Sequence, residues 1–299
     1  MTTAAEGNFS GQRLVIFGCG YVGAAVAAEA LRRGMLVTAV TRNAANAVLM
    51  RAEGINAVVA DLATTQWHGR VPDAPELALN CVSAGSGGVE GYRHSYVDGM
   101  ASIVAWARDR GAVGTVLYTS STSVYPQADG AVVDEAAPTT AAGERGRILL
   151  EAERQLREST AACHRWFILR IAGIYGPGRH HVLDQVRAGE LPGVGGHHLN
   201  LAHRDDIANA IWACFAAPTR IKDQIFNVAD DQPASKTEVV AWLAARIDRP
   251  VPSFTGEPHS ARRTITPDRV IANAKLKSTL GWSPRYPSFR EGYEILLSR

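Results

Sequence analysis

Lysine is scarce in this 299-residue chain, which has four lysines against 27 arginines. The four are Lys222, Lys236, Lys275 and Lys277, so no lysine precedes residue 222. A lysine shifts its pKa readily and can serve in proton transfer, whereas an arginine stays protonated. Lysine chemistry is therefore excluded from the first two-thirds of the chain.

The chain also lacks a long apolar run and an excess of one charge. No segment approaches the roughly 18 consecutive apolar residues that span a bilayer, so we expect neither an integral membrane protein nor a membrane partner. The 31 Lys and Arg residues nearly balance the 29 Asp and Glu residues, for a net charge of +2, so a basic surface for nucleic acid is not expected. A hydrophobic content of 46% is typical of a soluble globular protein.

The N-terminus and the cysteines indicate a cytoplasmic protein. The segment Met1–Gln12 lacks the basic and apolar regions of a secretory signal, and we interpret it as a flexible tail. The cysteines are scattered without a close-spaced pair and are expected to be free thiols; they are Cys19, Cys81, Cys163 and Cys214.

Short apolar segments rich in β-branched residues predict seven strands. They are Arg13–Phe17, Leu36–Val40, Asn56–Ala60, Leu77–Val82, Thr115–Ser120, Arg165–Ile171 and Asp223–Ala229. Helical spacing predicts helices between them and later in the chain, among them Gly146–Ser159, Asp205–Ala216, Lys236–Ile247 and a short one near Phe289–Leu297. Apolar strands separated by amphipathic helices indicate an α/β fold with a doubly wound parallel sheet. Beyond Gly173, stretches rich in Gly, Pro and His predict loops of a second, smaller lobe.

A glycine-rich sequence directly follows the first predicted strand and opens a helix. It reads Gly18-Cys19-Gly20-Tyr21-Val22-Gly23 and matches G-x-G-x-x-G. The first glycine permits a tight turn, the second lets the backbone approach a pyrophosphate, and the third lets helix and strand pack closely. The helix N-terminus then faces the anion. These six residues predict dinucleotide binding; the alternative is a degenerate turn that kept only the shape.

The end of the second strand favours NADP(H) over NAD(H). An NAD-preferring protein usually carries an acid about 20 residues after the glycine turn, for the ribose 2′-hydroxyl. Here the chain reads Thr41-Arg42-Asn43, and the first acid after Glu29 is Glu53. The guanidinium of Arg42 suits a 2′-phosphate, although Arg42 could instead be a solvated surface residue. Asp61 and Leu62, after the third strand, are expected near the adenine.

Several ordered motifs from Arg13 onward carry a family resemblance. They are GCGYVG, Asp61-Leu62, YTSSTSVYP, Asp134-Glu135, LRIAGIYGPGR, RDDIANAI, FNVADD and LGW. Together they resemble the extended short-chain dehydrogenase/reductase family, that is, the NAD-dependent epimerase/dehydratase group. The resemblance implies a Rossmann domain of residues 13–172 plus 201–229 and an interleaved substrate lobe of residues 173–200 plus 230–299. It also implies that Val82, Ser83 and Ala84 line the cofactor and that Ser121 hydrogen-bonds a substrate oxygen.

The chain departs from the family at its active-site Tyr-x-x-x-Lys pair. Alignment on Glu151 puts the pair at Gly143 and Arg147, and no tyrosine in the chain has a lysine four residues later. In the family mechanism the tyrosine exchanges a proton while the lysine lowers its pKa and holds the nicotinamide ribose. The pattern is similar to an atypical branch of the family. Arg147 could still contact a ribose hydroxyl, but it is a poor proton shuttle.

Other residues of the chain are candidates for the proton transfer that the missing tyrosine would perform. Tyr125 and Tyr175 lie on segments expected to reach the cofactor, and each is a candidate proton donor, as is a water or the substrate itself. The histidines His180, His181, His197, His198 and His203 lack the spacing of a zinc site, so no metal is expected, although His197 and His198 could contact substrate. No G-x-S-x-G is present, so Ser121 is not expected to be a nucleophile.

The leading hypothesis is an NADP(H)-binding reductase or epimerase-like enzyme that acts on a small polar metabolite, such as a carbonyl, an imine or a sugar nucleotide. NAD is the second choice of cofactor. The alternative hypothesis, from a different class, is a non-catalytic NAD(P)-binding sensor or regulatory protein. Analogy with the family also suggests a homodimer. The substrate and the proton donor are not assigned by the sequence.

Overall fold

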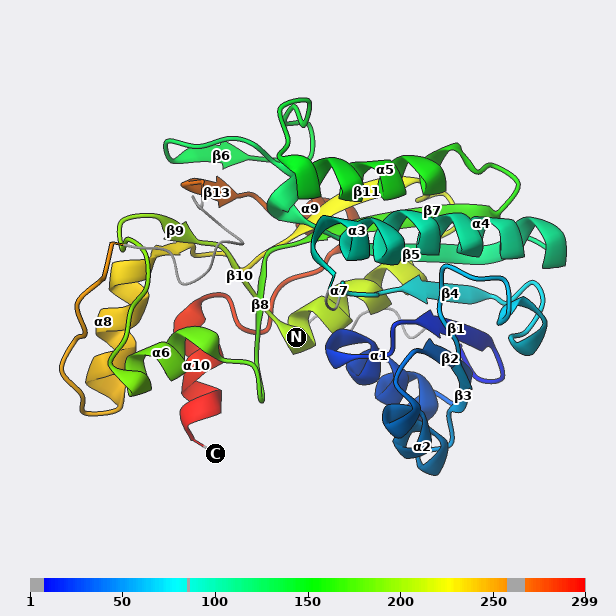
Figure 1. Ribbon diagram of the computed structural model, residues 1–299, viewed down its shortest axis with the longest axis horizontal. Helices are drawn as coiled ribbons and strands as arrows, with labels where there is room; N and C mark the ends of the chain where they lie inside the picture. Colours follow the sequence, from blue (N-terminus) through cyan, green and yellow to red (C-terminus); the bar gives the residue numbers. More distant parts are fainter. Residues whose placement is uncertain (1–7, 85–86, 257–266, 299) are drawn as a thin grey trace.

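The computed structural model describes residues 8–84, 87–256 and 267–298, and its centre is a seven-stranded sheet (Figure 1). The strand order is β11-β7-β5-β4-β1-β2-β3, and every neighbouring pair is parallel. The strands are β1 Arg13–Phe17, β2 Leu36–Thr41, β3 Asn56–Val59, β4 Leu77–Asn80, β5 Val113–Ser121, β7 Cys163–Ile171 and β11 Gln224–Val228. Chain order reverses between β1 and β4, so the predicted doubly wound α/β fold is confirmed.

The apolar strands bury both of their faces. On β1, Leu14 and Ile16 belong to one core while Val15 and Phe17 belong to another, and all four are fully buried. Successive side chains of a strand point to opposite faces, so a strand without polar alternation needs cover on both sides. The helices are α1 Tyr21–Arg32 and α7 Arg204–Ala216 on one face, and α4 Gly99–Arg110 and α5 Glu144–Glu158 on the other (Figure 1).

A third apolar core lies beside the sheet, in the part drawn at the left of Figure 1. It is formed mainly by α6 His181–Ala188, α8 Lys236–Arg246 and α10 Phe289–Leu297. Three two-stranded sheets join this part to the rest: β8 Gly173–Tyr175 with β10 Leu201–His203, β9 His198–Leu199 with β12 Ala234–Ser235, and β6 Ala131–Val133 with β13 Arg269–Ile271. The chain therefore leaves the main sheet after β7, returns to it through α7 and β11, and leaves again.

The remaining helices are short. They are α2 Ala44–Ala52, α3 Gly88–Arg93 and α9 Ala274–Leu280, together with a π-helical turn at His94–Asp98 that joins α3 to α4 and 3₁₀ turns at His68–Arg70 and Thr122–Val124. Among the described residues, no helix has the length and apolar character needed to cross a bilayer.

Part of the segment that we interpreted as a tail is packed. Phe9 is buried, with its ring 5.3 Å from that of Trp212 on α7 and the guanidinium of Arg33 over it. Residues 1–7 lie outside the described residues. The packed chain thus begins before the boundary at Gln12.

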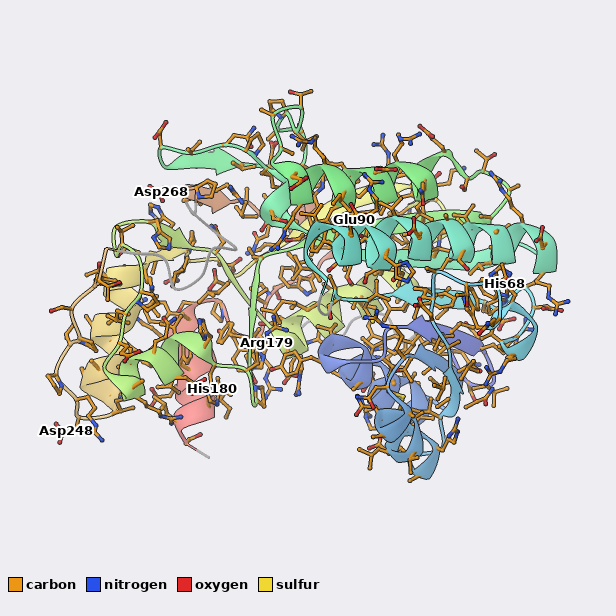
Figure 2. All side chains as sticks on the ribbon, in the orientation of Figure 1. His68, Glu90, Arg179, His180, Asp248 and Asp268 are labelled. Atoms are coloured by element: carbon orange, nitrogen blue, oxygen red, sulfur yellow. The ribbon has the colours of Figure 1, made fainter. Side chains whose placement is uncertain are left out.

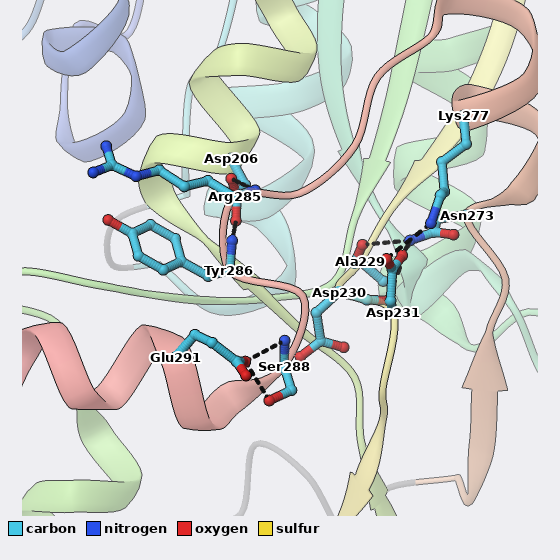
Figure 3. Close-up of polar contacts among 10 residues, drawn as sticks. All are labelled: Asp206, Ala229, Asp230, Asp231, Asn273, Lys277, Arg285, Tyr286, Ser288 and Glu291. Carbon is cyan, nitrogen blue, oxygen red and sulfur yellow. Dashed lines mark hydrogen bonds and ion pairs between the residues drawn. The ribbon is translucent and has the colours of Figure 1, made fainter. Parts of the chain in front are cut away.

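Asp206 joins the sheet domain to the C-terminal segment. Its carboxylate, in the first turn of α7, accepts the backbone N–H groups of Arg285 at 2.7 Å and Tyr286 at 3.1 Å (Figure 3). The indole of Trp282 donates to the Asp206 carbonyl at 3.3 Å. Burial raises the pKa of this carboxyl to about 6. The sequence indicated only a helix N-terminus here, and the structure adds a long-range anchor.

Asp206→Ala is expected to lower the free energy of unfolding by about 2–3 kcal/mol, because two backbone N–H groups, that of Tyr286 buried and that of Arg285 partly buried, lose their acceptor. Asp205→Ala is the matched control, since its carboxylate pairs with Arg204 at a partly exposed position and its loss should cost less than about 1 kcal/mol. Urea unfolding at neutral pH measures both. Equal losses for the two variants would contradict the anchoring role.

Candidate functional site

The glycine turn has the geometry that its motif requires. Gly18 has φ +82°, and a Cβ there would lie 2.6 Å from the Cα of Val82. A Cβ at Gly23 would lie 2.8 Å from the Sγ of Cys81, so this glycine lets α1 pack on the sheet. A Cβ at Gly20 would meet no atom within 4 Å. The second glycine therefore faces open space at the N-terminus of α1, where an anion would bind.

A cavity of about 710 Å³ runs along the carboxyl ends of the strands and is of the size of small-molecule sites. Eleven of the residues predicted from the sequence line it: Gly18, Cys19, Gly20, Tyr21, Val22, Thr41, Arg42, Leu62, Val82, Ser83 and Ser121. Ligands of doubly wound folds bind at this edge of the sheet, next to the point where the strand order reverses.

Four predicted residues do not line the cavity: Gly23, Asp61, Ala84 and Arg147. The carboxylate of Asp61 pairs with His94 at 2.9 Å, and although burial opposes ionisation, the hydrogen bonds from His94 and the Ala63 amide hold the pKa of Asp61 below its usual value. Arg147 is exposed and donates to the carbonyl of Ala142 at 2.9 Å. Its guanidinium is thus turned to its own helix start in this conformation.

The end of β2 presents positive charge and no acid. Arg42, Asn43 and Asn46 line the cavity there. The side chain of Asn43 caps α2 by accepting the amide of Asn46 at 3.0 Å. Arg42 is exposed and forms no ion pair with a carboxylate of the described chain within 4.0 Å. Its guanidinium is therefore available to a ligand beside the N-terminus of α2, which also favours an anion.

Ser121 stands at the carboxyl end of β5. Its Oγ accepts the amide of Ser123 at 3.2 Å, which leaves its own proton available to a ligand in the cavity. The neighbouring Ser120 donates instead to Glu153 at 2.7 Å. Of the two hydroxyls, only that of Ser121 keeps its proton free of these contacts.

The structure contradicts the prediction that Tyr125 or Tyr175 is the proton donor. Tyr125 is 1% exposed; its hydroxyl donates to Asn227 at 2.8 Å and accepts from Arg170 at 3.0 Å. Tyr175 is 2% exposed and packs against Tyr293, and burial raises its pKa strongly. Neither lines the cavity, because both side chains point into packed cores.

The cavity residues that sequence reasoning did not predict include Tyr92, Tyr96 and Arg179. Arg179 ends a tight Gly176–Arg179 hairpin, and the Tyr21 hydroxyl fixes that hairpin by donating to the Pro177 carbonyl at 3.0 Å. Arg179 thereby lies between the sheet and the C-terminal helices (Figure 2). The four-residue spacing of Tyr92 and Tyr96 was the available signal, because it puts both rings on one side of a helix.

The histidines are held by local partners. His180 pairs with Asp184 at 2.8 Å and His198 with Asp268 at 2.8 Å. His203 caps α7 by accepting the amide of Asp205 at 3.2 Å. His197 and His198 do not line the cavity, and the described ranges contain no group of three His, Cys, Asp or Glu residues able to hold a metal.

Comparison with models of protein families identifies the family of this chain. The model of the NAD-dependent epimerase/dehydratase family matches residues 14–229. The chain belongs to this family.

Known proteins are similar to this family member over most of its length. Protein YeeZ of Escherichia coli (strain K12) is 26% identical over 282 residues, which is 92% of this chain and 97% of YeeZ. The 3-diazoavenalumate denitrifying reductase of a Streptomyces species is 30% identical over 215 residues, 65% of this chain and 68% of that protein. The UDP-glucuronic acid 4-epimerase from Bacillus cereus, solved with UDP-glucuronic acid and NAD, has a TM-score of 0.78 at 16% identity, covering 96% of this chain and 98% of that one, which shows the shared fold.

The residues present fit the dinucleotide that the family uses. Gly20 leaves room for a pyrophosphate against the backbone, and the first turn of α1 contains no acidic side chain to repel it. Thr41 and Arg42 lie at the opposite end of the cavity from Ser121 along the strand order, since β2 and β5 are separated by β1 and β4. The cavity thus has room for an extended ligand between Arg42 and Ser121.

Proposed function

We propose that the protein is an NADP(H)-dependent oxidoreductase or epimerase-like enzyme that acts on a small polar metabolite of the carbonyl, imine or sugar-nucleotide type. The observation that carries this proposal is that Gly20, Arg42 and Ser121 line one cavity. A reductase and a sugar-nucleotide epimerase among the similar proteins support both reaction types.

The proposed site divides the work among three groups. When bound, the nicotinamide supplies or accepts a hydride. The amides of the Gly18–Tyr21 turn bind the pyrophosphate, and Arg42 binds the 2′-phosphate. Ser121 donates its hydroxyl proton in a hydrogen bond to the substrate oxygen and so orients the reacting carbon.

Preference for NADP(H) is tested by Arg42→Ala. Loss of a charge-assisted hydrogen bond to the 2′-phosphate is expected to weaken NADPH binding about 10-fold to 100-fold and to change NADH binding by less than about threefold. Fluorescence titration with both cofactors measures the ratio. Arg108→Ala, an exposed arginine on α4, is the matched control and should leave both affinities unchanged. An NADPH affinity that survives Arg42→Ala removes the reason for choosing NADP(H) over NAD(H).

A non-catalytic NAD(P)-binding sensor is the second candidate, and the first turn of α5 favours it. Gly143 is the N-cap residue there, so no side chain supplies a phenol at that position. The two candidates differ in turnover. NADPH that binds but is oxidised by none of a panel of ketones, aldehydes, imines and nucleotide sugars would favour the sensor.

We also propose a cytoplasmic location and a homodimer. The location is supported by the four cysteines, all of which are free thiols. The homodimer rests on analogy with the family, and light scattering on the purified protein at micromolar concentration tests it. A monomeric mass at that concentration would exclude the dimer.

A further inference from the structure

Two phenols from the region after β4 line the cavity that Ser121 also lines. Tyr92 on α3 and Tyr96 in the π-helical turn both line it, and both are half-buried. Their rings are 4.5 Å apart. The same cavity contains Thr119, Ser120 and Ser121 at the end of β5. The cavity that Ser121 lines therefore contains phenols, although the chain has none at position 143.

Tyr92 is held against the first turn of α5. The guanidinium of Arg145 lies 5.5 Å from the centre of the Tyr92 ring. An ion pair between Arg93 and Glu151, at 2.9 Å, holds α3 and α5 together one residue further along the chain. Tyr92 and Arg145 thus put a phenol and a permanent cation together at the helix end where Gly143 has only open space, since a Cβ there would meet no atom within 4 Å.

All three tyrosines of the cavity have hydrogen-bond partners in the protein. The Tyr21 hydroxyl donates to the Pro177 carbonyl at 3.0 Å. The Tyr96 hydroxyl accepts the backbone amide of Ala84 at 3.3 Å and is also hydrogen-bonded to Tyr92, and burial raises the pKa of Tyr96. Tyr96 is therefore better placed to hold the Tyr92 side chain than to transfer a proton itself.

We propose that Tyr92 is the catalytic acid–base of this site, acting on a carbonyl substrate held by Ser121, with Arg145 as its positioning residue. This inference rests on the proposed function. In the reductive direction the carbonyl carbon gains a hydride from the reduced nicotinamide, the C=O π bond breaks, and the oxygen takes the phenolic proton of Tyr92. The resulting phenolate is stabilised by the Arg145 charge and regains a proton from water.

Tyr92→Phe tests the proton transfer. Removing a general acid is expected to lower kcat for NADPH-dependent carbonyl reduction at least about 100-fold with KM changed less than about threefold. Tyr96→Phe, the matched control, should lower kcat less than about tenfold. NADPH affinity should be equal in all three proteins. Wild-type rates in Tyr92→Phe would overturn the inference about Tyr92 alone, whereas a wild type that binds NADPH but reduces no carbonyl would overturn the proposed enzymatic function and Tyr92 with it.

Arg145→Gln separates a positioning role from a purely structural one. The groups that face Tyr92 are Arg145 from α5, Tyr96 from the π-helical turn and, more distantly, Tyr118 from β5 and the Arg93–Glu151 pair. Loss of the adjacent cation makes the phenol harder to ionise, so the alkaline limb of the kcat profile should move to higher pH by about one unit. An unmoved limb would remove Arg145 from the mechanism.

Nitration provides a readout that needs no turnover. Tetranitromethane should modify Tyr92, and NADP⁺ should protect it about tenfold or more, as located by mass spectrometry of peptides. The fragment 2′,5′-ADP, which lacks the nicotinamide, should not protect it. Equal protection by NADP⁺ and the fragment, or none by either, would show that Tyr92 is not at the nicotinamide end and would overturn the inference.

Discussion

Glu153→Ala is expected to lower the free energy of unfolding by about 3–5 kcal/mol, because it leaves the buried guanidinium of Arg170 without its counter-ion. The two side chains are 1% and 5% exposed, and two hydrogen bonds join them, at 3.1 and 2.7 Å. Glu153 also accepts the Ser120 hydroxyl at 2.7 Å, and Arg170 donates to Tyr125 at 3.0 Å. The network therefore ties α5, β5 and β7 together directly beneath the Ser121 end of the cavity.

Two comparisons make this expectation specific. Glu158→Ala breaks the exposed Arg154–Glu158 pair of the same helix, whose side chains are 59% and 62% exposed, and should cost less than about 1 kcal/mol. Glu153→Met combined with Arg170→Met removes both charges and should recover much of the loss, since a buried charge is costly mainly when unpaired. Urea unfolding of the four proteins supplies the values. A loss for Glu153→Ala no larger than that for Glu158→Ala would contradict the buried-pair argument.

The sequence predicted the sheet well because its signals are local. The apolar run Arg13–Phe17 coincides with β1, and the other six predicted strands each overlap an observed one within two residues at either end. Strand β5 starts at Val113, two residues before the predicted start at Thr115, because Val113 pairs with Cys163 on β7. The hydrophobic periodicity of one segment does not reveal the strand with which it pairs. The short pairs β6–β13 and β9–β12 were missed for the same reason, since each joins segments far apart in the chain.

The candidate site was predictable only where one motif contains it. Gly18, Gly20 and Arg42 could be found because backbone conformation and charge at a strand end follow from adjacent residues. Tyr125 was a wrong candidate because its motif places it near the cavity, whereas hydrogen bonds to Asn227 and Arg170, on two distant strands, turn its hydroxyl into the core. Tyr92 was overlooked because its significance comes from Arg145, which lies on another helix.

A second large effect, on the pH dependence of stability, is expected from Asp230, whose carboxyl group follows β11. It is 5% exposed, and its Oδ1 has no hydrogen-bond partner. The nearby Lys277 and Asn273 donate to Asp231 instead, each at 2.8 Å, and the Asp230 side chain points away from Lys277 (Figure 3). Burial, with the charges of Asp231, Asp206 and Glu291, raises the pKa of Asp230 to about 8.

A raised carboxyl pKa makes the folded protein bind one more proton than the unfolded chain between the two pKa values. For Asp230 this interval runs from about 4 in the unfolded chain to about 8 in the folded protein. Stability therefore falls as pH rises through the interval, at roughly 1.4 kcal/mol per pH unit for one proton. Asp206, whose pKa is raised to about 6, contributes in the same direction over the lower half of the interval.

Asp230→Asn removes this penalty and should make the protein more stable than wild type, with a gain that grows by about 3–4 kcal/mol between about pH 5 and about pH 8. Urea unfolding across that range measures the difference between the two profiles. Asp248→Asn, an exposed carboxyl beyond α8 on the far side of the third core (Figure 2), is the charge-matched control and should follow the wild-type profile. Parallel profiles for Asp230→Asn and wild type would mean that Asp230 is ionised in the folded protein and that a cation from the surrounding segments reaches it.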